Sequence, residues 1–443
     1  MDMDPHGPGL RVVLYSHDSV GLGHTRRNLA IAHALADRLP AATGRRVSGL
    51  LITGERSATS YACPEGWDWV VMPGIRKSRG RYAPRTLNVG MGRLMDVRSS
   101  LIDGTLGAFR PHVMIVDRHA FGVDGELDAP LARLRRENPD CRVVLGLREV
   151  LDDPQTAAAE WARIGVDRIR TVFDELWVYG DPAAHDPLAS GEIPPDLADL
   201  LRFTGYLSLG RHGASPPETE RPFLVTMVGG GSDGFALTAA AAAASIPDGY
   251  RHLVVTGPQM PPAARRRVQA LAAPGTRVVD SVPDGLGYVE AAAAVVVMGG
   301  YNTVCEVLGS GTPALVVPRE EPRREQLIRA SALAGSGAVD LLRAGDATPE
   351  ALASWFAAAV APDSPESTTP GPAVSRARPA AVAAAFPEGT TPGVPAAQHA
   401  ARSRLDLDGL AAVASHAARL AAADARSAAR LAPTGKEPLH ATA

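Results

Sequence analysis

Short apolar runs alternate with longer segments of helical spacing along the first half of the chain. The runs expected to be strands are residues 11–15, 47–52, 69–72, 113–116, 143–147 and 176–179. Apolar residues recur at helical spacing over residues 25–39, 91–109, 127–137 and 157–173. This alternation is typical of a parallel sheet with helices on both faces, and it predicts an α/β fold.

The same alternation restarts after residues 208–221, a polar segment rich in glycine and proline that we interpret as a linker. The second half contains expected strands at 223–227, 252–255, 277–279 and 295–297 and an alanine-rich helix at 235–245. Two similar halves predict two Rossmann-like domains, at 10–207 and 222–360, whose parallel sheets face a central cleft. Ligands of open α/β sheets bind beyond the carboxyl ends of the strands, so we expect the functional site in that cleft.

The last part of the chain divides into two segments of different character. Residues 363–398 consist mainly of Pro, Ala, Ser and Thr with little periodicity, and we expect a disordered insertion there. Helical spacing returns from Leu405 onwards. We therefore expect residues 403–432 to form a terminal helix that packs on the body of the protein.

Composition narrows the class of protein only modestly. The chain has 443 residues, 45% of them hydrophobic and 21% charged, with a formal net charge of -3. This balance fits a two-domain globular protein and gives no reason to expect a nucleic-acid partner. Cys63, Cys141 and Cys305 match no metal or redox motif, so reduced thiols are expected. Residues 1–10 lack an apolar signal-peptide core, and we expect a cytoplasmic protein, with peripheral membrane contact left open.

The most informative feature of the sequence is a glycine turn, Gly299-Gly300, between a buried strand and a helix. Such a turn exposes backbone N–H groups at a helix N-terminus, where the helix dipole favours a phosphate. Glu306 shares a helix face with Asn302 and Thr303, so its carboxylate is placed to accept hydrogen bonds from ribose hydroxyls. The alternative is a capping box that starts at Thr303, in which Glu306 bonds only a backbone N–H.

The stretch around this turn resembles the C-terminal domain of family 28 glycosyltransferases. The residues that match the nucleotide-sugar signature of that family are Gly299, Gly300, Thr303, Glu306, Gly311, Pro313, Pro318, Glu325 and Gln326. The resemblance implies the GT-B arrangement, a donor site that also includes Asn302, and a nucleotide-diphosphate sugar as donor. It further implies transfer with inversion, without a metal or any other cofactor. Gly299 departs from the signature, since the family often has Ser at this position. The order of elements over residues 11–345 also resembles a bacterial group of predicted glycosyltransferases.

A second glycine loop follows the first strand of the first half. It contains Gly21 and Gly23 and is followed by His24, and in family 28 the corresponding loop ends in Gly-His and faces the donor phosphates. His24 is a candidate general base, because histidine titrates near neutral pH. The alternative is that His24 caps the following helix or bonds a backbone carbonyl. The third glycine of a dinucleotide fingerprint is missing, since position 26 is Arg, and this disfavours an NAD-dependent enzyme.

A third glycine loop opens the second half and contains Gly230, Gly231 and Ser232. It resembles the family loop that lies against the donor diphosphate. The alternative is a tight turn that needs glycine only for its left-handed backbone. We favour close approach of a ligand, because consecutive glycines exceed what a simple turn requires.

Charged residues follow two further strands of the first half. Asp117 comes after the fourth strand and Glu149 after the fifth, so both are alternative bases at the cleft. The alternative for each is an ion pair with neighbouring arginines. Residues 73–90 hold several cations and Tyr82 in a glycine-rich loop that could hold an acceptor, although such charge runs are more often a solvated surface.

These observations predict a glycosyltransferase that moves a sugar from a nucleotide-diphosphate sugar, UDP-linked by resemblance, to an acceptor hydroxyl. The acceptor is left open as a glycan, a lipid-linked molecule or a small molecule. One alternative is an isomerase like the UDP-N-acetylglucosamine 2-epimerases, which would turn over its substrate without an acceptor. Another is a nucleotide-sugar-binding protein without catalysis, in which loss of the candidate bases would change no activity.

Overall fold

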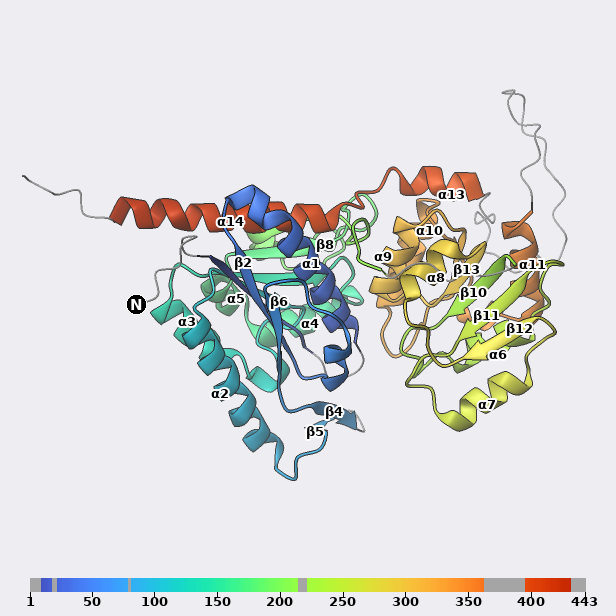
Figure 1. Ribbon diagram of the computed structural model, residues 1–443, viewed down its shortest axis with the longest axis horizontal. Coiled ribbons are helices and arrows are strands. Elements are labelled where there is room, and N and C mark those ends of the chain that lie inside the picture. The colour runs from blue at the N-terminus through green and yellow to red at the C-terminus, as the bar shows by residue number, and fades with distance from the viewer. Residues whose placement is uncertain (1–8, 18–21, 79–80, 214–220, 362–394, 432–443) are drawn as a thin grey trace, which may run out of the picture.

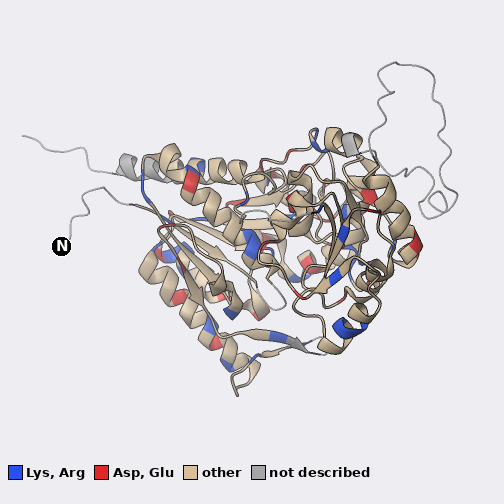
Figure 2. Cartoon of the chain, turned by 45° about the vertical axis from the view of Figure 1, so that its right-hand side comes forward, with Lys and Arg blue, Asp and Glu red and all other residues tan. Residues whose placement is uncertain are grey.

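The computed structural model describes residues 9–17, 22–78, 81–213, 221–361 and 395–431. Two α/β domains lie side by side, and a long C-terminal helix lies across the first of them (Figure 1). The predicted α/β fold of two domains with parallel sheets is confirmed. In Figure 2 basic and acidic residues are interspersed along both domains, as the small net charge leads us to expect.

The first domain is built on a seven-stranded sheet with the order β3, β2, β1, β6, β7, β8, β9. Its strands are β1 (Leu10–Tyr15), β2 (Val47–Thr53), β3 (Trp67–Val71), β6 (Val113–Asp117), β7 (Arg142–Arg148), β8 (Glu175–Tyr179) and β9 (Leu201–Phe203). The helices are α1 (Gly23–Thr43), α2 (Met91–Phe109), α3 (Asp128–Glu137), α4 (Pro154–Ile164) and α5 (Val166–Val172). Neighbouring strands are parallel throughout, because helical crossovers connect most of them.

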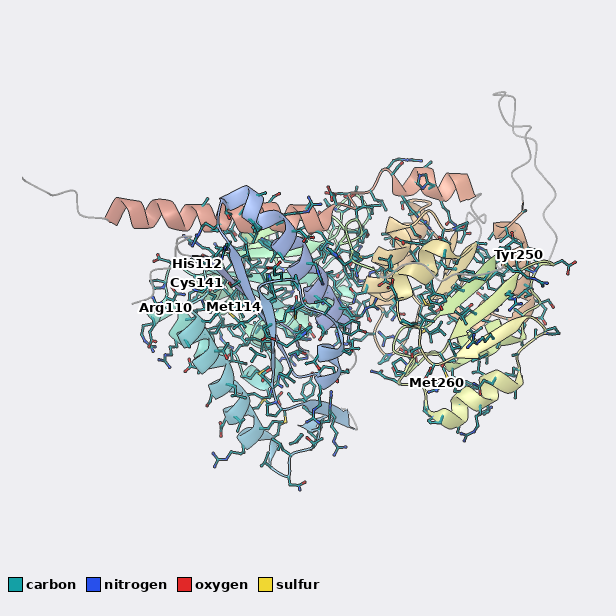
Figure 3. The ribbon with its side chains drawn as sticks, viewed as in Figure 1. Arg110, His112, Met114, Cys141, Tyr250 and Met260 are labelled. Atoms are coloured by element: carbon teal, nitrogen blue, oxygen red, sulfur yellow. The ribbon has the colours of Figure 1, made fainter. Side chains whose placement is uncertain are left out.

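The second domain repeats this plan with a six-stranded parallel sheet of order β12, β11, β10, β13, β14, β15. Its strands are β10 (Phe223–Met227), β11 (Arg251–Val255), β12 (Thr276–Val279), β13 (Ala294–Val297), β14 (Ala314–Val316) and β15 (Asp340–Leu341). The helices are α6 (Phe235–Ala243), α7 (Pro262–Ala270), α8 (Gly285–Ala291), α9 (Tyr301–Gly309), α10 (Glu325–Gly335) and α11 (Pro349–Ala359). Tyr250 and Met260, labelled in Figure 3, precede and follow β11 along the chain and so lie near the two ends of this strand.

The strand orders identify where a ligand binds. In the first sheet the strand order reverses between the neighbouring strands β1 and β6. In the second sheet it reverses between β10 and β13. Open α/β sheets bind ligands at such switch points, beyond the carboxyl ends of the strands. The three glycine loops of the sequence all follow β1, β10 or β13, and therefore lie at these two switch points.

The apolar core has three main parts. One cluster packs helices α2 to α5 on one face of the first sheet, and a second fills one face of the second sheet. The third joins the domains, because it runs from Ile31 and Leu35 on α1 through Tyr301 to Val304 on α9. The domains are thus in apolar contact as well as linked by the chain.

The C-terminal segment touches both domains. Its first helix, α13 (Pro395–Arg402), docks on the second domain, where the buried Arg402 donates to the carbonyl oxygens of Ala338, Ser310 and Thr312. The chain then crosses back, and Asp408 forms an antiparallel bridge with Leu207. The last helix, α14 (Gly409–Leu431), packs along α1 of the first domain.

Some elements differ from the expectation. The helix expected over 157–173 is divided into α4 and α5 at Gly165, whose φ of 87° no helix interior has. The charged segment at 73–90 contains a hairpin of β4 (Ile75–Ser78) and β5 (Arg81–Pro84), which its cations concealed. Residues 395–398 of the expected disordered insertion belong to α13; the rest of that insertion, from 363 to 394, lies outside the described residues.

Candidate active site

The Gly299-Gly300 turn lies across the domain interface from the second glycine loop, the one that contains Gly23. Gly300 is the N-cap of α9 and has no side-chain cap, so the N-terminus of this helix keeps its backbone donors. Asn302, on the first turn, donates from Nδ2 to the carbonyl oxygen of Gly23 at 2.7 Å. Gly299 has a φ of 84°, and a Cβ there would lie 2.9 Å from Cγ1 of Val316, which explains why this chain lacks the serine of family 28.

His24 forms a pair with Asp117 at the switch point of the first domain. Its Nδ1 lies 2.8 Å from Oδ2 of Asp117, which is fully buried and also accepts from Nε and Nη2 of Arg27. Nη2 of Arg27 also lies 3.1 Å from Nδ1 of His24. The contact to the Asp117 carboxylate is the shorter of the two, and an ionised carboxylate only accepts, so we assign the proton to Nδ1, which leaves the lone pair of the neutral ring on Nε2. Among the described residues no hydrogen bond engages Nε2, and the His24 side chain is 22% exposed. His24 is therefore arranged as a base that Asp117 orients.

Asp117 is poorly suited to act as the base itself. Burial alone would raise its pKa, but the charges of Arg27 and His24 and their hydrogen bonds outweigh burial and lower its pKa from 3.8 to about 2. Both oxygens are occupied by these two side chains. The geometry therefore favours His24 over Asp117 for proton transfer.

The lowered pKa of Asp117 gives a testable pH dependence. A depressed carboxyl pKa stabilises the fold above the unfolded value near 3.8, and this contribution is lost as the pH falls towards about 2. We expect the gap in unfolding free energy between the wild type and Asp117→Asn to shrink by about 2 kcal/mol between pH 5 and pH 2.5. Urea unfolding at several pH values measures the gap, and Asp346→Asn, an exposed aspartate, is the control. A gap that stays constant over this range contradicts the assignment.

Glu149 lies in a buried ion pair between the domains. Its two oxygens accept from Nε of Arg329 at 2.6 Å and from Nη2 at 3.1 Å, and both side chains are fully buried. Arg329 also donates from Nη1 to the carbonyl oxygen of Gly299 at 3.2 Å. The structure favours the ion-pair interpretation of Glu149, with an arginine of the second domain in place of a neighbour in sequence.

Glu306 is buried beside the first domain, with 2% of its surface exposed. Its Oε1 accepts from Nη2 of Arg26 at 2.5 Å and lies 3.9 Å from Nη1 of Arg211. The helix begins at Tyr301 with Gly300 as N-cap, so Thr303 is not a cap and the alternative capping box does not form. Glu306 therefore has a carboxylate at the interface whose role is not helix capping.

The third glycine loop lies beside two other predicted donor residues. Nη1 of Arg319 lies 3.4 Å from Oδ2 of Asp233, next to Ser232, and its Nη2 donates to Glu325. The backbone N–H of Arg319 donates to Oε1 of Gln326 at 3.0 Å. One arginine thus connects the loop of the second domain with the start of α10.

The glycines of this loop have a packing reason as well as a ligand reason. Gly231 has a φ of 87°, and a Cβ there would lie 2.0 Å from the carbonyl oxygen of Thr256. Gly230 and Ser232 are exposed and free of such contacts with backbone. The tight-turn alternative therefore accounts for Gly231, and close approach of a ligand remains the interpretation for Gly230 and Ser232. Gly21 of the second glycine loop lies outside the described residues.

Sequence reasoning missed two histidines beside His24. The ring centroids of His17 and His119 are 3.8 Å apart, and those of His17 and His24 are 5.9 Å apart. Burial lowers the pKa of both His17 and His119 well below 6.5, so both rings are neutral. Tyr82 of the β4–β5 hairpin lies beside His17, with its hydroxyl 3.4 Å from Nε2 of that histidine. The sequence does contain a signal for this cluster, because His17 comes two residues after the end of β1 and His119 two residues after the end of β6.

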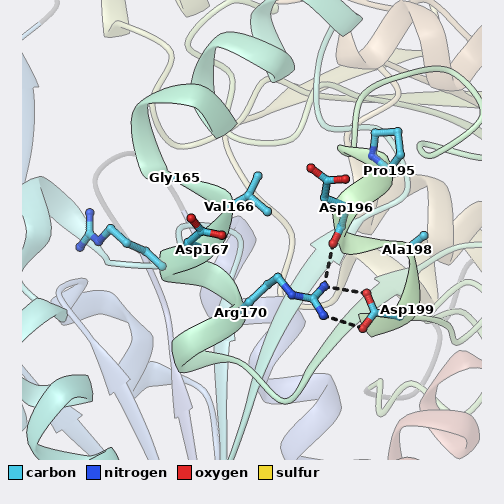
Figure 4. A pocket seen from close by; sticks show the side chains of 9 residues that line it. Gly165, Val166, Asp167, Arg170, Pro195, Asp196, Ala198 and Asp199 are labelled. Atoms are coloured by element: carbon cyan, nitrogen blue, oxygen red, sulfur yellow. Dashed lines mark hydrogen bonds and ion pairs between the residues drawn. The ribbon is translucent and has the colours of Figure 1, made fainter.

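A surface hollow elsewhere on the first domain carries none of the candidate residues. It lies between α5 and the 3-10 helix η3 (Pro195–Leu200), where Arg170 bonds both oxygens of Asp199 and the carbonyl of Asp196 (Figure 4). Within the described ranges, no group of His, Cys, Asp and Glu side chains is arranged to hold a metal ion. The helices in those same ranges include none that is both long and apolar enough to span a membrane.

Comparison with solved structures defines the class of fold. The glycotransferase of kitacinnamycin aligns with a TM-score of 0.55 at 18% identity, over 94% of this chain and 99% of that one. A candidate UDP-N-acetylglucosamine 2-epimerase from Listeria monocytogenes aligns with a TM-score of 0.52 at 12% identity, over 93% and 98%. The chain has the GT-B fold, and the fold alone does not separate transferase from epimerase.

Comparison of sequences shows a family resemblance in the second domain. Residues 225–380 match the model of the glycosyltransferase family 28 C-terminal domain. A UDP-N-acetylglucosamine--N-acetylmuramyl-(pentapeptide) pyrophosphoryl-undecaprenol N-acetylglucosamine transferase of Corynebacterium efficiens is 34% identical over 31% of this chain and 37% of its own length. The protein of the same name in Klebsiella pneumoniae is 29% identical over 42% and 47%. The chain spans less than half the length of these curated relatives, and its second domain is similar to the C-terminal domain of family 28.

Proposed function

We propose that this protein is a glycosyltransferase that uses a nucleotide-diphosphate sugar as donor and a hydroxyl compound as acceptor. The observation that carries the proposal is the His24–Asp117 pair directly beside the contact between Gly23 and Asn302. This contact joins the loop that holds the base to the helix N-terminus that fits a diphosphate. The proposed base, His24, is thus the neighbour of Gly23 in the chain, and the proposed phosphate site is the helix N-terminus that carries Asn302.

The chemistry that this geometry supports is a single displacement with inversion. Nε2 of His24 takes the proton of the acceptor hydroxyl while its oxygen forms a bond to the anomeric carbon. The bond from that carbon to the diphosphate oxygen breaks, and the nucleoside diphosphate leaves with the electron pair. Backbone donors of the glycine loops and the N-terminus of α9 stabilise the charge on the leaving group, and no step requires a metal.

The donor is proposed to be UDP-linked. The two curated relatives carry UDP-N-acetylglucosamine in their names, and the matching family domain covers the Gly299 turn and Glu306. The same names include a pyrophosphoryl-undecaprenol acceptor, which makes a lipid-linked hydroxyl compound the first acceptor to test. Glycans and small hydroxyl compounds are the other acceptor classes.

A reaction without acceptor distinguishes transfer from epimerisation. The protein is incubated with UDP-N-acetylglucosamine alone, and the products are separated by chromatography and identified by NMR. A transferase releases UDP slowly by hydrolysis and leaves the remaining sugar unchanged, with faster release once an acceptor is added. Formation of the 2-epimer identifies the isomerase alternative, and binding without any turnover identifies a binding protein.

Loss of Glu306 is expected to weaken donor binding. In Glu306→Ala the proposed contact to the ribose hydroxyls is lost, and a hydrogen bond to a charged group contributes about 1.5–3 kcal/mol. Calorimetric titration with UDP measures the change, and Glu290→Ala, an exposed glutamate on α8, is the control. Unchanged affinity for UDP in Glu306→Ala would show that Glu306 serves only its ion pair with Arg26.

A further inference from the structure

Arg148, the last residue of β7, has a guanidinium group without any partner in the part of the chain that the structure describes. Its Nε is buried and makes no hydrogen bond. The side chain is partly buried at the carboxyl edge of the first sheet. Arginine has five N–H donors, and leaving them unpaired away from water is unfavourable.

The arginines around it are all paired with carboxylates. Arg27 bonds Asp117, Arg118 donates to Glu160 at 2.7 Å, and Arg329 bonds Glu149. Burial, followed by the charges of Arg329, Arg27 and Arg118, lowers the pKa of Arg148 to about 9. The charge of Glu325 acts in the opposite direction, but Glu325 is paired with Arg319. A guanidinium among three cations, with no ion pair of its own in the described ranges, is an arrangement that a bound anion would stabilise.

Its position lies between the two halves of the proposed site. β7 pairs with β6, in register Asp117 with Gly146, so Arg148 extends just past the strand end that holds the partner of His24. The next residue, Glu149, binds the arginine that donates to the carbonyl of Gly299. Arg148 therefore lies between the His24–Asp117 pair and the Gly299-Gly300 turn.

We propose that Arg148 is a ligand for a phosphate group bound at the domain interface. A planar guanidinium matches the oxygens of a phosphate and binds them with two parallel hydrogen bonds. The phosphate comes either from the diphosphate of the donor or from a phosphate on the acceptor. The anion site stands on the observations at Arg148, whereas its assignment to a glycosyl transfer reaction rests on the proposed function.

The test is calorimetric titration of the full chain with inorganic pyrophosphate, UDP and uridine. The variants are Arg148→Gln and Arg148→Lys, and Arg163→Gln, an exposed arginine on α4, is the matched control with the same change of charge. Loss of a charge-assisted contact should weaken pyrophosphate binding about tenfold or more in Arg148→Gln, with an intermediate loss in Arg148→Lys. Uridine, which has no phosphate, should bind wild type and variants alike. Circular dichroism verifies folding, and Arg148→Lys carries the test if Arg148→Gln does not fold.

The two sources of phosphate give different results. If Arg148 binds the donor diphosphate, UDP loses affinity together with pyrophosphate. If it binds a phosphate of the acceptor, UDP affinity is unchanged, and pyrophosphate binding to the UDP-saturated protein is lost in Arg148→Gln. Equal pyrophosphate binding by the wild type, Arg148→Gln and Arg163→Gln, or none by the wild type, overturns the proposal. Arg148-dependent pyrophosphate binding without any binding of UDP would retain the anion site and reject the proposed function.

Discussion

Replacing His24 by alanine is expected to lower the rate of sugar transfer by about 10²–10⁴-fold, the usual contribution of a general base. Donor affinity should change little, because the side chain of His24 faces Asp117 and its free Nε2 is assigned to the acceptor hydroxyl. The measurement is steady-state transfer to an acceptor, or slow donor hydrolysis, combined with titration of UDP. A fall in turnover without a fall in affinity identifies an interaction made in the transition state.

The comparison includes a control and a partner variant. His399→Ala removes an exposed histidine on α13 and should leave the rate unchanged. Asp117→Asn should also lower the rate, since it removes the group that fixes the proton on Nδ1 of His24. Near-normal transfer by His24→Ala would reject His24 as the base, and loss of UDP binding in parallel with turnover would make it a phosphate-loop residue.

Breaking the pair between Glu149 and Arg329 is expected to cost about 3–5 kcal/mol of stability, because Glu149→Ala leaves a buried guanidinium without its counter-charge. Both side chains are fully buried and the contact is bidentate. Urea unfolding monitored by circular dichroism measures the loss. Asp199→Ala is the matched control, since Asp199 has the same bidentate geometry with Arg170 at the surface, where solvent screens the pair and its loss should cost far less stability.

A double variant tests whether the stability lost in Glu149→Ala comes from the unpaired charge of Arg329. Glu149→Leu combined with Arg329→Met replaces both charges by apolar side chains of similar volume, and such replacements are often neutral or stabilising. Most of the stability lost in Glu149→Ala should therefore return in the double variant. A loss below about 1 kcal/mol in Glu149→Ala would show that the interface has other means of balancing the charge of Arg329.

Most of the fold follows from hydrophobic patterns within each strand and helix. The buried strand 223–227 was predicted with the bounds that β10 has, since its residues are apolar on both faces and polar turns flank it. The β4–β5 hairpin was missed because its cations and glycines resemble a solvated loop. The break between α4 and α5 was missed for a similar reason. Gly165 has a positive φ and ends the helix, but the helical spacing of the apolar residues continues across it.

The site was predictable in its loops and not in its pairs. The Gly299 turn, His24 and Glu306 are each selected by residues next to them in the chain, and their roles in donor binding and proton transfer stay predictions. Their partners come from far away, since Arg26 and Glu306 are 280 residues apart and Glu149 and Arg329 are 180 apart. Spacing along one sequence has no information on such contacts, so Glu149 was assigned a possible role as base when it serves as a counter-ion.

The return of α14 to the first domain means that this domain is not a continuous segment of the chain. Part of the apolar core beneath α1 comes from Val413 and Ala417, which lie beyond the whole second domain in sequence. A fragment that ended at the linker would keep every strand of the first sheet and still expose the apolar side of Ile31 and Leu35. Two fragments divided at the linker would instead complement each other, since the second one brings the missing helix with it.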